Sequence, residues 1–330
     1  MYDIVGFGEV LIRLSTQNFN RLEQATALDI RVGGAELNCV VTAQRLGMKC
    51  GYVTRLAKNP LGRMAFNKIR EQGIDASYVL WSDSDRQGIN FLEFGAMPRP
   101  SATFYDRANS AISKIQPGMV DWDKIFAETK AFHCTGITPA LSPNCLAATA
   151  EALKKAKAQG VQVSFDLNYR AKLWSGEQAN AGLSPLMKYV DILVTTEEDV
   201  FRVFQLKGTD WNDVARKLVD KFGFKIVCIT LREDITVWRN SWTAIALKDG
   251  KIYEDRKYDI EVVDRVGAGD NFAGGFLYAY MTKNGDVQTA LKYGNACAVL
   301  KHSNAGDYAF YTKEEVETLV AGKGSLRIAR

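Results

Sequence analysis

The sequence lacks any long hydrophobic run and any large excess of charge of one sign. None of its 330 residues belongs to a stretch near the roughly 20 apolar residues that a membrane-spanning helix needs. The net charge is only +4, with no basic run or RNA-binding aromatic signature, so we expect neither a membrane nor nucleic acid as a partner. With 47% hydrophobic and 24% charged residues, the composition is typical of a soluble globular protein.

Paired cysteines are also missing. No two of the six cysteines form a C-x-x-C pair, and most lie within apolar segments. We therefore expect buried free thiols rather than disulfides or a zinc site. The opening residues, MYDIVGFGEVLIRL, lack the basic start and long apolar core of a signal peptide. These features predict a reduced, cytoplasmic protein.

Strand-like and helix-like segments alternate along most of the chain. The alternation predicts an α/β fold with a mostly parallel sheet covered by helices on both faces. Strand-type segments lie at 2–8, 49–56, 130–136, 161–168, 191–196 and 225–231, and helix-type segments at 36–47, 60–73 and 145–160.

Two regions interrupt the alternation. Residues 10–32 and 87–106 contain strand-like pieces with no helix between consecutive strands. We expect them to form a small antiparallel sheet that acts as a lid. No linker or repeat divides the chain, so one domain over residues 1–330 is the simplest interpretation. The open edges of the lid could pair with a second subunit, which favours a homodimer or a multiple of one.

The stretch DRVGAGDNFAGGFLYAYM, at 264–281, places flexible residues and a carboxylate directly before a helix-like run. A helix N-terminus at the carboxyl edge of such a sheet attracts an anion, and Gly267 and Gly269 let the backbone approach it closely. Asp270 would repel that anion unless it does chemistry, and a general base there fits phosphoryl transfer. An ordinary helix start with an acidic first turn explains the same residues equally well. No P-loop motif occurs, and GFG at 6–8 lacks the third glycine of a dinucleotide site, because Leu11 stands there.

Two segments carry a family resemblance. DRVGAGDNFAGGFL resembles the C-terminal signature of the ribokinase-like (PfkB) carbohydrate kinases, and GGAELNCVVTAQRLG, at 33–47, resembles their N-terminal signature. They occur in the expected order, about 230 residues apart. The resemblance implies a three-layer αβα fold with a β-sheet lid and ATP-dependent phosphorylation of a sugar. It also implies Mg²⁺ as cofactor, with a monovalent cation such as K⁺ as a further candidate.

The resemblance assigns roles residue by residue. The implied catalytic base is Asp270, and the implied anion hole comprises the backbone N–H groups of Gly267, Ala268, Gly269 and Asp270. The sugar would contact Gly34 and Asn38, the nucleotide would lie near Thr230 and Asn295, and magnesium would be held by Glu198 or Asp199. Three positions depart from the family pattern. Arg265 replaces a threonine, Asn271 replaces a small residue, and TTEED at 195–199 has threonine where the family has asparagine.

Two arginine-containing segments, FYDRANSA at 104–111 and FDLNYRAKLW at 165–174, bear on the substrate. Arginine binds a carboxylate or phosphate with paired hydrogen bonds, whereas a neutral sugar gives it little to do. Both segments resemble the 2-keto-3-deoxygluconate kinases of this family. That resemblance implies substrate contacts from Asn90 (where these enzymes often have tyrosine), Tyr105, Arg107, Arg170 and Asp307, and nucleotide contacts from Asn168 and Arg170.

The predicted activity is phosphorylation of a sugar acid, 2-keto-3-deoxygluconate, to its 6-phosphate. A 5-dehydro-2-deoxygluconokinase is the second interpretation, followed by a fructokinase or ribokinase. A non-catalytic sugar-binding relative is a further alternative, but it would have no need of the intact GAGD segment.

Overall fold

The computed structural model describes residues 1–323. Its main feature is a ten-stranded sheet, in the order β13-β12-β11-β10-β9-β8-β1-β4-β5, with β14 beside β12. Seven neighbouring strands run parallel. They are β11 (Ile226–Thr236), β10 (Ile192–Thr196), β9 (Gln162–Asp166), β8 (Thr129–Thr135), β1 (Tyr2–Phe7), β4 (Cys50–Ala57) and β5 (Val79–Ser82). The antiparallel additions are β12 (Arg239–Lys248), β13 (Lys251–Glu254) and β14 (Tyr258–Glu261).

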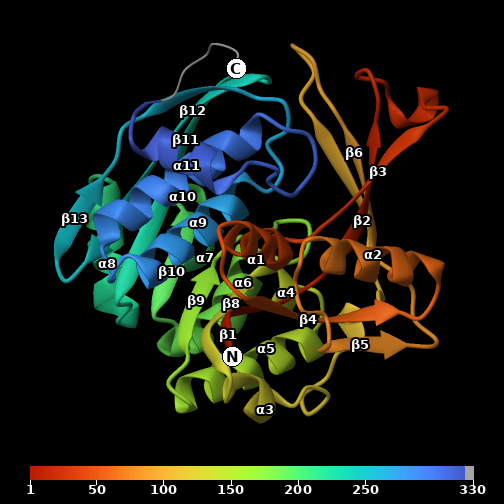
Figure 1. Ribbon diagram of the computed structural model, residues 1–330, viewed down its shortest axis with the longest axis horizontal. Coiled ribbons are helices and arrows are strands. Elements are labelled where there is room, and N and C mark those ends of the chain that lie inside the picture. Colours follow the sequence, from red (N-terminus) through yellow and green to blue (C-terminus); the bar gives the residue numbers. More distant parts are fainter. Residues whose placement is uncertain (324–330) are drawn as a thin grey trace.

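Helices cover both faces of this sheet (Figure 1). The strand residues alternate between two cores: Ile192 and Val194 face one, and Leu193 faces the other. The first core is closed by α1 (Ala35–Arg45), α2 (Pro60–Glu71), α9 (Ala268–Thr282), α10 (Val287–His302) and α11 (Lys313–Val320). The second is closed by α3 (Trp122–Phe126), α5 (Pro143–Ala158), α6 (Gly176–Leu183), α7 (Glu197–Phe204) and α8 (Trp211–Phe222). Shorter turns are α4 (Ile137–Ala140), η1 (Leu22–Gln24), η2 (Ile112–Lys114) and η3 (Ser184–Tyr189). The predicted α/β layering is confirmed.

A second sheet projects away from this body (Figure 1). It consists of β3 (Leu28–Gly33), β2 (Leu11–Thr16), β6 (Ile89–Glu93) and β7 (Ala102–Asp106), in that order, and is called the lid below. The separate sheet was predicted correctly. Its predicted antiparallel pairing is right for β2 with β3 and for β6 with β7, but wrong for β2 with β6, which run parallel. The reason is that β2 follows β1 and β6 follows β5. Because β1 and β5 run parallel in the main sheet, the chain leaves the carboxyl ends of both strands in the same direction. Each then turns back as an antiparallel hairpin, with β3 and with β7.

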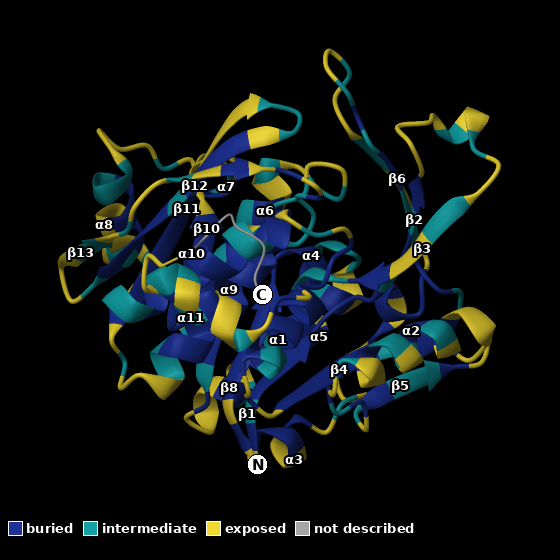
Figure 2. Cartoon of the chain, turned by 45° about the horizontal axis from the view of Figure 1, so that its top comes forward, coloured by how far each residue is buried: buried dark blue, intermediate teal, exposed yellow. Residues whose placement is uncertain are grey.

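The register of the lid separates an apolar face from a polar one. Ile30, Leu14, Phe91 and Phe104 lie side by side across the four strands. Ile30 is 54% exposed and Phe104 49% exposed, so part of this row is open to solvent. The opposite face carries the paired residues Asn90 and Tyr105. Figure 2 shows that much of the lid is exposed or half-buried, unlike the main sheet.

Two other expectations can be compared with the structure. All six cysteines are buried free thiols, as predicted. Within residues 1–323, no helix combines the length and apolar character needed to cross a lipid bilayer.

Candidate active site

A cleft of about 580 Å³ lies between the carboxyl ends of the parallel strands, the start of α9 and the polar face of the lid. This edge of an open α/β sheet is where such folds bind ligands. All but one of the predicted site residues line the cleft. They are Gly34, Asn38, Asn90, Tyr105, Arg107, Asn168, Arg170, Glu198, Asp199, Thr230, Gly267, Ala268, Gly269, Asp270 and Asp307.

Asn295 is the predicted residue that does not line the cleft. It is fully buried in α10, where its Oδ1 accepts a hydrogen bond from Trp242 Nε1 at 3.0 Å. Its Nδ2 donates to Asp255 Oδ2, also at 3.0 Å. Trp242 itself lines the cleft, so Asn295 supports the wall from behind. Sequence reasoning missed Trp242, because nothing near it in the chain marks a ligand site.

The turn before α9 has the shape expected of an anion-binding helix start. Gly267 adopts a left-handed conformation, with φ of 87°, and a Cβ there would lie 2.5 Å from the Asp307 carbonyl oxygen. A Cβ at Gly269 would meet nothing within 4 Å, so this backbone lies open to the cleft. The contacts of Asn271 explain why asparagine stands where the family pattern has a small residue. Its Nδ2 donates to the Gly267 carbonyl at 2.7 Å and its Oδ1 accepts from Thr42 Oγ1 at 2.7 Å, which ties the turn to α1.

We expect Gly267→Ala to destabilise the protein more than Gly118→Ala. Gly118 has a similar φ of 81°, but a Cβ there would meet nothing within 4 Å. Both changes incur the left-handed strain of about 1–2 kcal/mol, and only Gly267→Ala adds the clash with Asp307. Urea unfolding of both variants measures the difference. Equal losses would contradict the tight packing of this turn.

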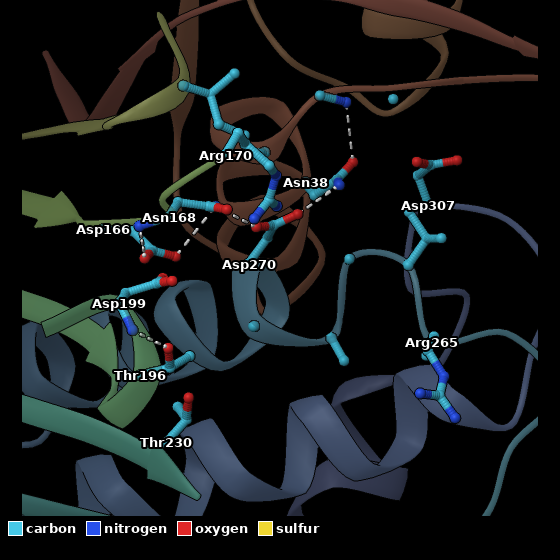
Figure 3. A pocket seen from close by; sticks show the side chains of 18 of the residues that line it. Asn38, Asp166, Asn168, Arg170, Thr196, Asp199, Thr230, Arg265, Asp270 and Asp307 are labelled. Atoms are coloured by element: carbon cyan, nitrogen blue, oxygen red, sulfur yellow. Dashed lines mark hydrogen bonds between the residues drawn. The ribbon is translucent and has the colours of Figure 1, made fainter. Parts of the chain in front are cut away.

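Asp270 occupies the centre of the cleft, in the first turn of α9 (Figure 3). Its Oδ2 accepts a hydrogen bond from Asn38 Nδ2 at 2.7 Å, and its Oδ1 accepts from Asn168 Nδ2 at 3.3 Å. Burial raises the pKa of Asp270 to about 6, against the lowering effects of Asn38 and Arg170. Such a carboxylate is oriented by two amides and is ionised at neutral pH. It can therefore accept a proton from a ligand hydroxyl.

Asp166, Asp199 and Glu36 are three of the further carboxyl groups that line the cleft. Burial and the neighbouring charges of Asp270 and Asp199 raise the pKa of Asp166, and burial raises that of Asp199 to about 6. The third, Glu36, is buried in α1. Its Oε1 accepts hydrogen bonds from Thr135 and Thr138, each at 2.8 Å, and burial raises its pKa to about 7. Sequence reasoning missed Asp166 and Glu36, although each lies two residues from a predicted contact, Asn168 or Asn38.

The acidic groups also bear on magnesium. Among residues 1–323, no three acidic, histidine or cysteine side chains are grouped as a complete metal site. Mg²⁺ commonly binds through one or two carboxylates plus substrate phosphates and water. Asp166 and Asp199 fit that requirement, because a cation would relieve the mutual repulsion that raises the pKa of Asp166. Glu198 fits less well, since its side chain is 70% exposed and pairs with Arg202 at 2.7 Å.

The two predicted arginines differ in their surroundings. Arg170 donates to the Tyr169 carbonyl at 3.1 Å and points toward Asp270 (Figure 3). Arg107 is buried, forms an ion pair with Glu9 through Nη2 and lies 5.0 Å from the centre of the Tyr105 ring. Its Nε is buried and has no hydrogen-bond partner within the described chain. The guanidinium thus keeps donor capacity beyond its pair with Glu9.

The remaining predicted residues have structural partners of their own. Thr230 ends the parallel part of β11, and its Oγ1 donates to the Thr195 carbonyl at 3.4 Å. Asp307 is buried and pairs with Arg13 at 3.2 Å. Arg265, the residue in the threonine position, donates to Asp234 at 3.2 Å and to the Val237 carbonyl at 2.8 Å. It therefore ties the turn before α9 to the β11–β12 hairpin.

The fold and the cleft together define a carbohydrate kinase. Residues 1–313 match the pfkB family of carbohydrate kinases, and the chain belongs to this family. A 2-dehydro-3-deoxygalactonokinase of Haloferax volcanii is 39% identical over 320 residues, which cover 97% of each chain. A 5-dehydro-2-deoxygluconokinase of Bacillus licheniformis is 28% identical over 327 residues, covering 98% of this chain and 97% of the relative. The crystal structure of 2-dehydro-3-deoxygluconokinase from Thermotoga maritima superposes with a TM-score of 0.94 at 38% identity, covering 98% of this chain and 99% of that one.

Proposed function

We propose that the protein transfers the γ-phosphoryl group of ATP to a sugar acid, with 2-keto-3-deoxygluconate and its 6-hydroxyl as the preferred acceptor. The observation that supports this proposal most strongly is that one cleft contains both a buried carboxylate, Asp270, and a buried cation beside the lid, Arg107. Asp270 is held by two amides at a helix N-terminus, and Arg107 retains a donor, Nε, that has no partner among residues 1–323. The named activities of the relatives support a sugar acid as substrate.

The proposed chemistry assigns each group one task. Asp270 accepts the proton of the acceptor hydroxyl, whose oxygen forms the new bond to the γ-phosphorus while the bond to ADP breaks. The N–H groups of Gly267, Ala268 and Gly269, together with Arg170, stabilise the negative charge on the transferred group. Asp166 and Asp199 would hold Mg²⁺, which when bound neutralises phosphate charge.

Substrate and nucleotide occupy opposite parts of the cleft in this proposal. The sugar acid contacts Gly34 and Asn38 on α1, and Asn90, Tyr105 and Arg107 at the lid, with Asp307 at its far end. The nucleotide lies along Asn168, Thr230 and the wall formed by Trp242, with Asn295 behind it. Arg170 lies between the two parts. Closure of the lid would shield the reaction from water, which otherwise competes as acceptor.

A turnover assay over a panel of sugars tests the proposal. The panel contains 2-keto-3-deoxygluconate, 2-keto-3-deoxygalactonate, 5-dehydro-2-deoxygluconate, fructose and ribose. We expect the highest kcat/KM with 2-keto-3-deoxygluconate. The galactonate substrate is the second candidate, because it matches the named activity of the Haloferax relative. A preference for fructose or ribose would contradict the sugar-acid assignment, and turnover of none would favour a non-catalytic binding protein.

The pH dependence should report the environment of Asp270. The base must be ionised, and its pKa is raised to about 6, so kcat/KM should fall as the pH drops through about 6. The shorter hydrogen bond, from Asn38, lowers the pKa of Asp270, so Asn38→Ala should raise this pKa. We expect it to move the acid limb upward by about one pH unit. Asn168→Ala removes the longer bond at 3.3 Å and should move the limb less. An unmoved limb in Asn38→Ala would contradict the assignment of that limb to Asp270.

We also propose that two copies of the chain associate through the apolar row of the lid and act in the cytoplasm. The row of Ile30, Leu14, Phe91 and Phe104 supports the association, because partly exposed apolar rows favour burial against a partner. The six buried free thiols support a reducing compartment. Light scattering should give a dimer or a multiple of one, and Phe104→Asp should lower the mass. A monomeric wild type would rule out this association.

A further inference from the structure

Lys301 is a fully buried lysine in the last turn of α10. Lysine is almost never completely buried without a partner. Within residues 1–323, the hydrogen-bond partners of this amine are backbone carbonyls. Its Nζ donates to the carbonyl oxygen of Asp264 at 3.0 Å and to that of Asn304 at 3.2 Å. The C-terminal end of a helix carries partial negative charge, which favours a cation at this position. The catalytic mechanism proposed above does not use the charge of Lys301.

The two carbonyls that Lys301 holds belong to the two loops that form one side of the cleft. The loop at 264–267 leads into the turn before α9, and the loop at 304–307 ends in Asp307, whose carbonyl packs against Gly267. Asp264 connects the same loops through its carboxylate. Its Oδ1 accepts from the Val266 N–H and its Oδ2 from the Gly306 N–H, both at 3.0 Å.

Lys301 adds a second buried cation to the charged groups of this region. Arg13, from the lid strand β2, pairs with Asp264 at 2.6 Å and with Asp307 at 3.2 Å. These two carboxylates therefore face two buried cations, Arg13 and Lys301. Removing the ammonium would take one positive charge from these two buried carboxylates, directly behind the proposed site for phosphate. It would also take from two carbonyl oxygens the donor that they now share.

We propose that Lys301 is the built-in cation of the anion hole. It is a positioning residue whose ammonium holds the 264–267 and 304–307 loops together and makes catalysis independent of added monovalent cations. The inference rests on the proposed anion hole at the start of α9. A monovalent ion such as K⁺ has no task between these two carbonyl oxygens, because the ammonium already donates to both of them.

The test compares Lys301→Ala with Lys301→Met in the full-length enzyme. Both remove the charge, but alanine leaves space for an ion between the two carbonyls, whereas methionine fills it. ADP is measured directly by chromatography in tetramethylammonium buffer, so that no coupling enzyme adds its own cation requirement. We expect wild type to be unaffected by K⁺ or NH₄⁺ at about 100 mM. Lys301→Ala should lose at least about tenfold in kcat and recover most of it with either ion, and Lys301→Met should lose as much without recovery. Lys292→Ala, on the same helix, is the control and should match wild type.

Each other outcome overturns the inference. Activation of wild type by K⁺ would show that the Lys301 ammonium does not replace a monovalent cation. This measurement needs only the wild-type enzyme, so it remains decisive even if a variant fails to fold. Full activity of Lys301→Ala, or a loss that neither ion restores, would make Lys301 a purely structural residue. These results are distinct from a failure of the proposed mechanism, which would appear as activity in a variant without the Asp270 carboxylate.

Discussion

Asp270→Asn should lower kcat by a factor of about 10²–10⁴, the usual contribution of a positioned general base, while sugar binding largely survives. The asparagine keeps the shape of the side chain and can still bond Asn38 and Asn168 after an amide rotation, but it cannot accept the hydroxyl proton. Steady-state kinetics measure kcat, and calorimetric titration with the sugar acid measures binding.

The control for Asp270→Asn is the same substitution at an exposed carboxylate. Asp83 is 82% exposed and pairs with Lys58 at the surface, so Asp83→Asn should leave both kcat and binding unchanged. Near-normal turnover in Asp270→Asn would refute its role as base. Loss of binding together with turnover would instead indicate that the carboxylate mainly organises the cleft.

Arg107→Ala should reduce kcat/KM for 2-keto-3-deoxygluconate by an amount equivalent to about 2–5 kcal/mol, the cost of removing one partner of a buried charge pair. It should affect fructose far less if wild type accepts that sugar slowly. The reason is that a neutral sugar offers no carboxylate to the donor that Glu9 leaves unpaired. The decisive measurement is kcat/KM for both substrates in wild type and variant. Equal losses would make Arg107 a structural residue.

Glu9 requires its own control, because Arg107→Ala also removes the ion-pair partner of this buried carboxylate. Burial already raises the pKa of Glu9 against the lowering effect of Arg107. Glu9→Gln alone should retain the preference for the acid sugar, since Arg107 keeps its charge. Glu9→Gln combined with Arg107→Ala should still lose that preference. If the double variant instead recovers it, the role of Arg107 is to neutralise Glu9 and not to bind substrate.

The sequence by itself determined the layered architecture, because the period of apolar residues is a local property. Ile192, Leu193 and Val194 show how this works. An unbroken apolar run supplies both faces of a buried parallel strand, and helices must then cover both. The start of α9 could equally be predicted from the sequence, since Gly267, Gly269 and Asp270 lie within four consecutive residues at the start of an apolar, helix-like run.

Only the tertiary structure decided which distant groups meet in the cleft. Asn38 and Asp270 are 232 residues apart, and Arg13 and Asp264 are 251 apart, yet each pair is hydrogen-bonded. No local pattern encodes such contacts, because they follow from the order of strands in the sheet. The parallel pairing of β2 with β6 and the position of Asn295 behind Trp242 have the same origin. Burial likewise exists only after folding. It raises the pKa of Asp270 and encloses the charge of Lys301, because the assembled layers exclude the water that would otherwise solvate both groups.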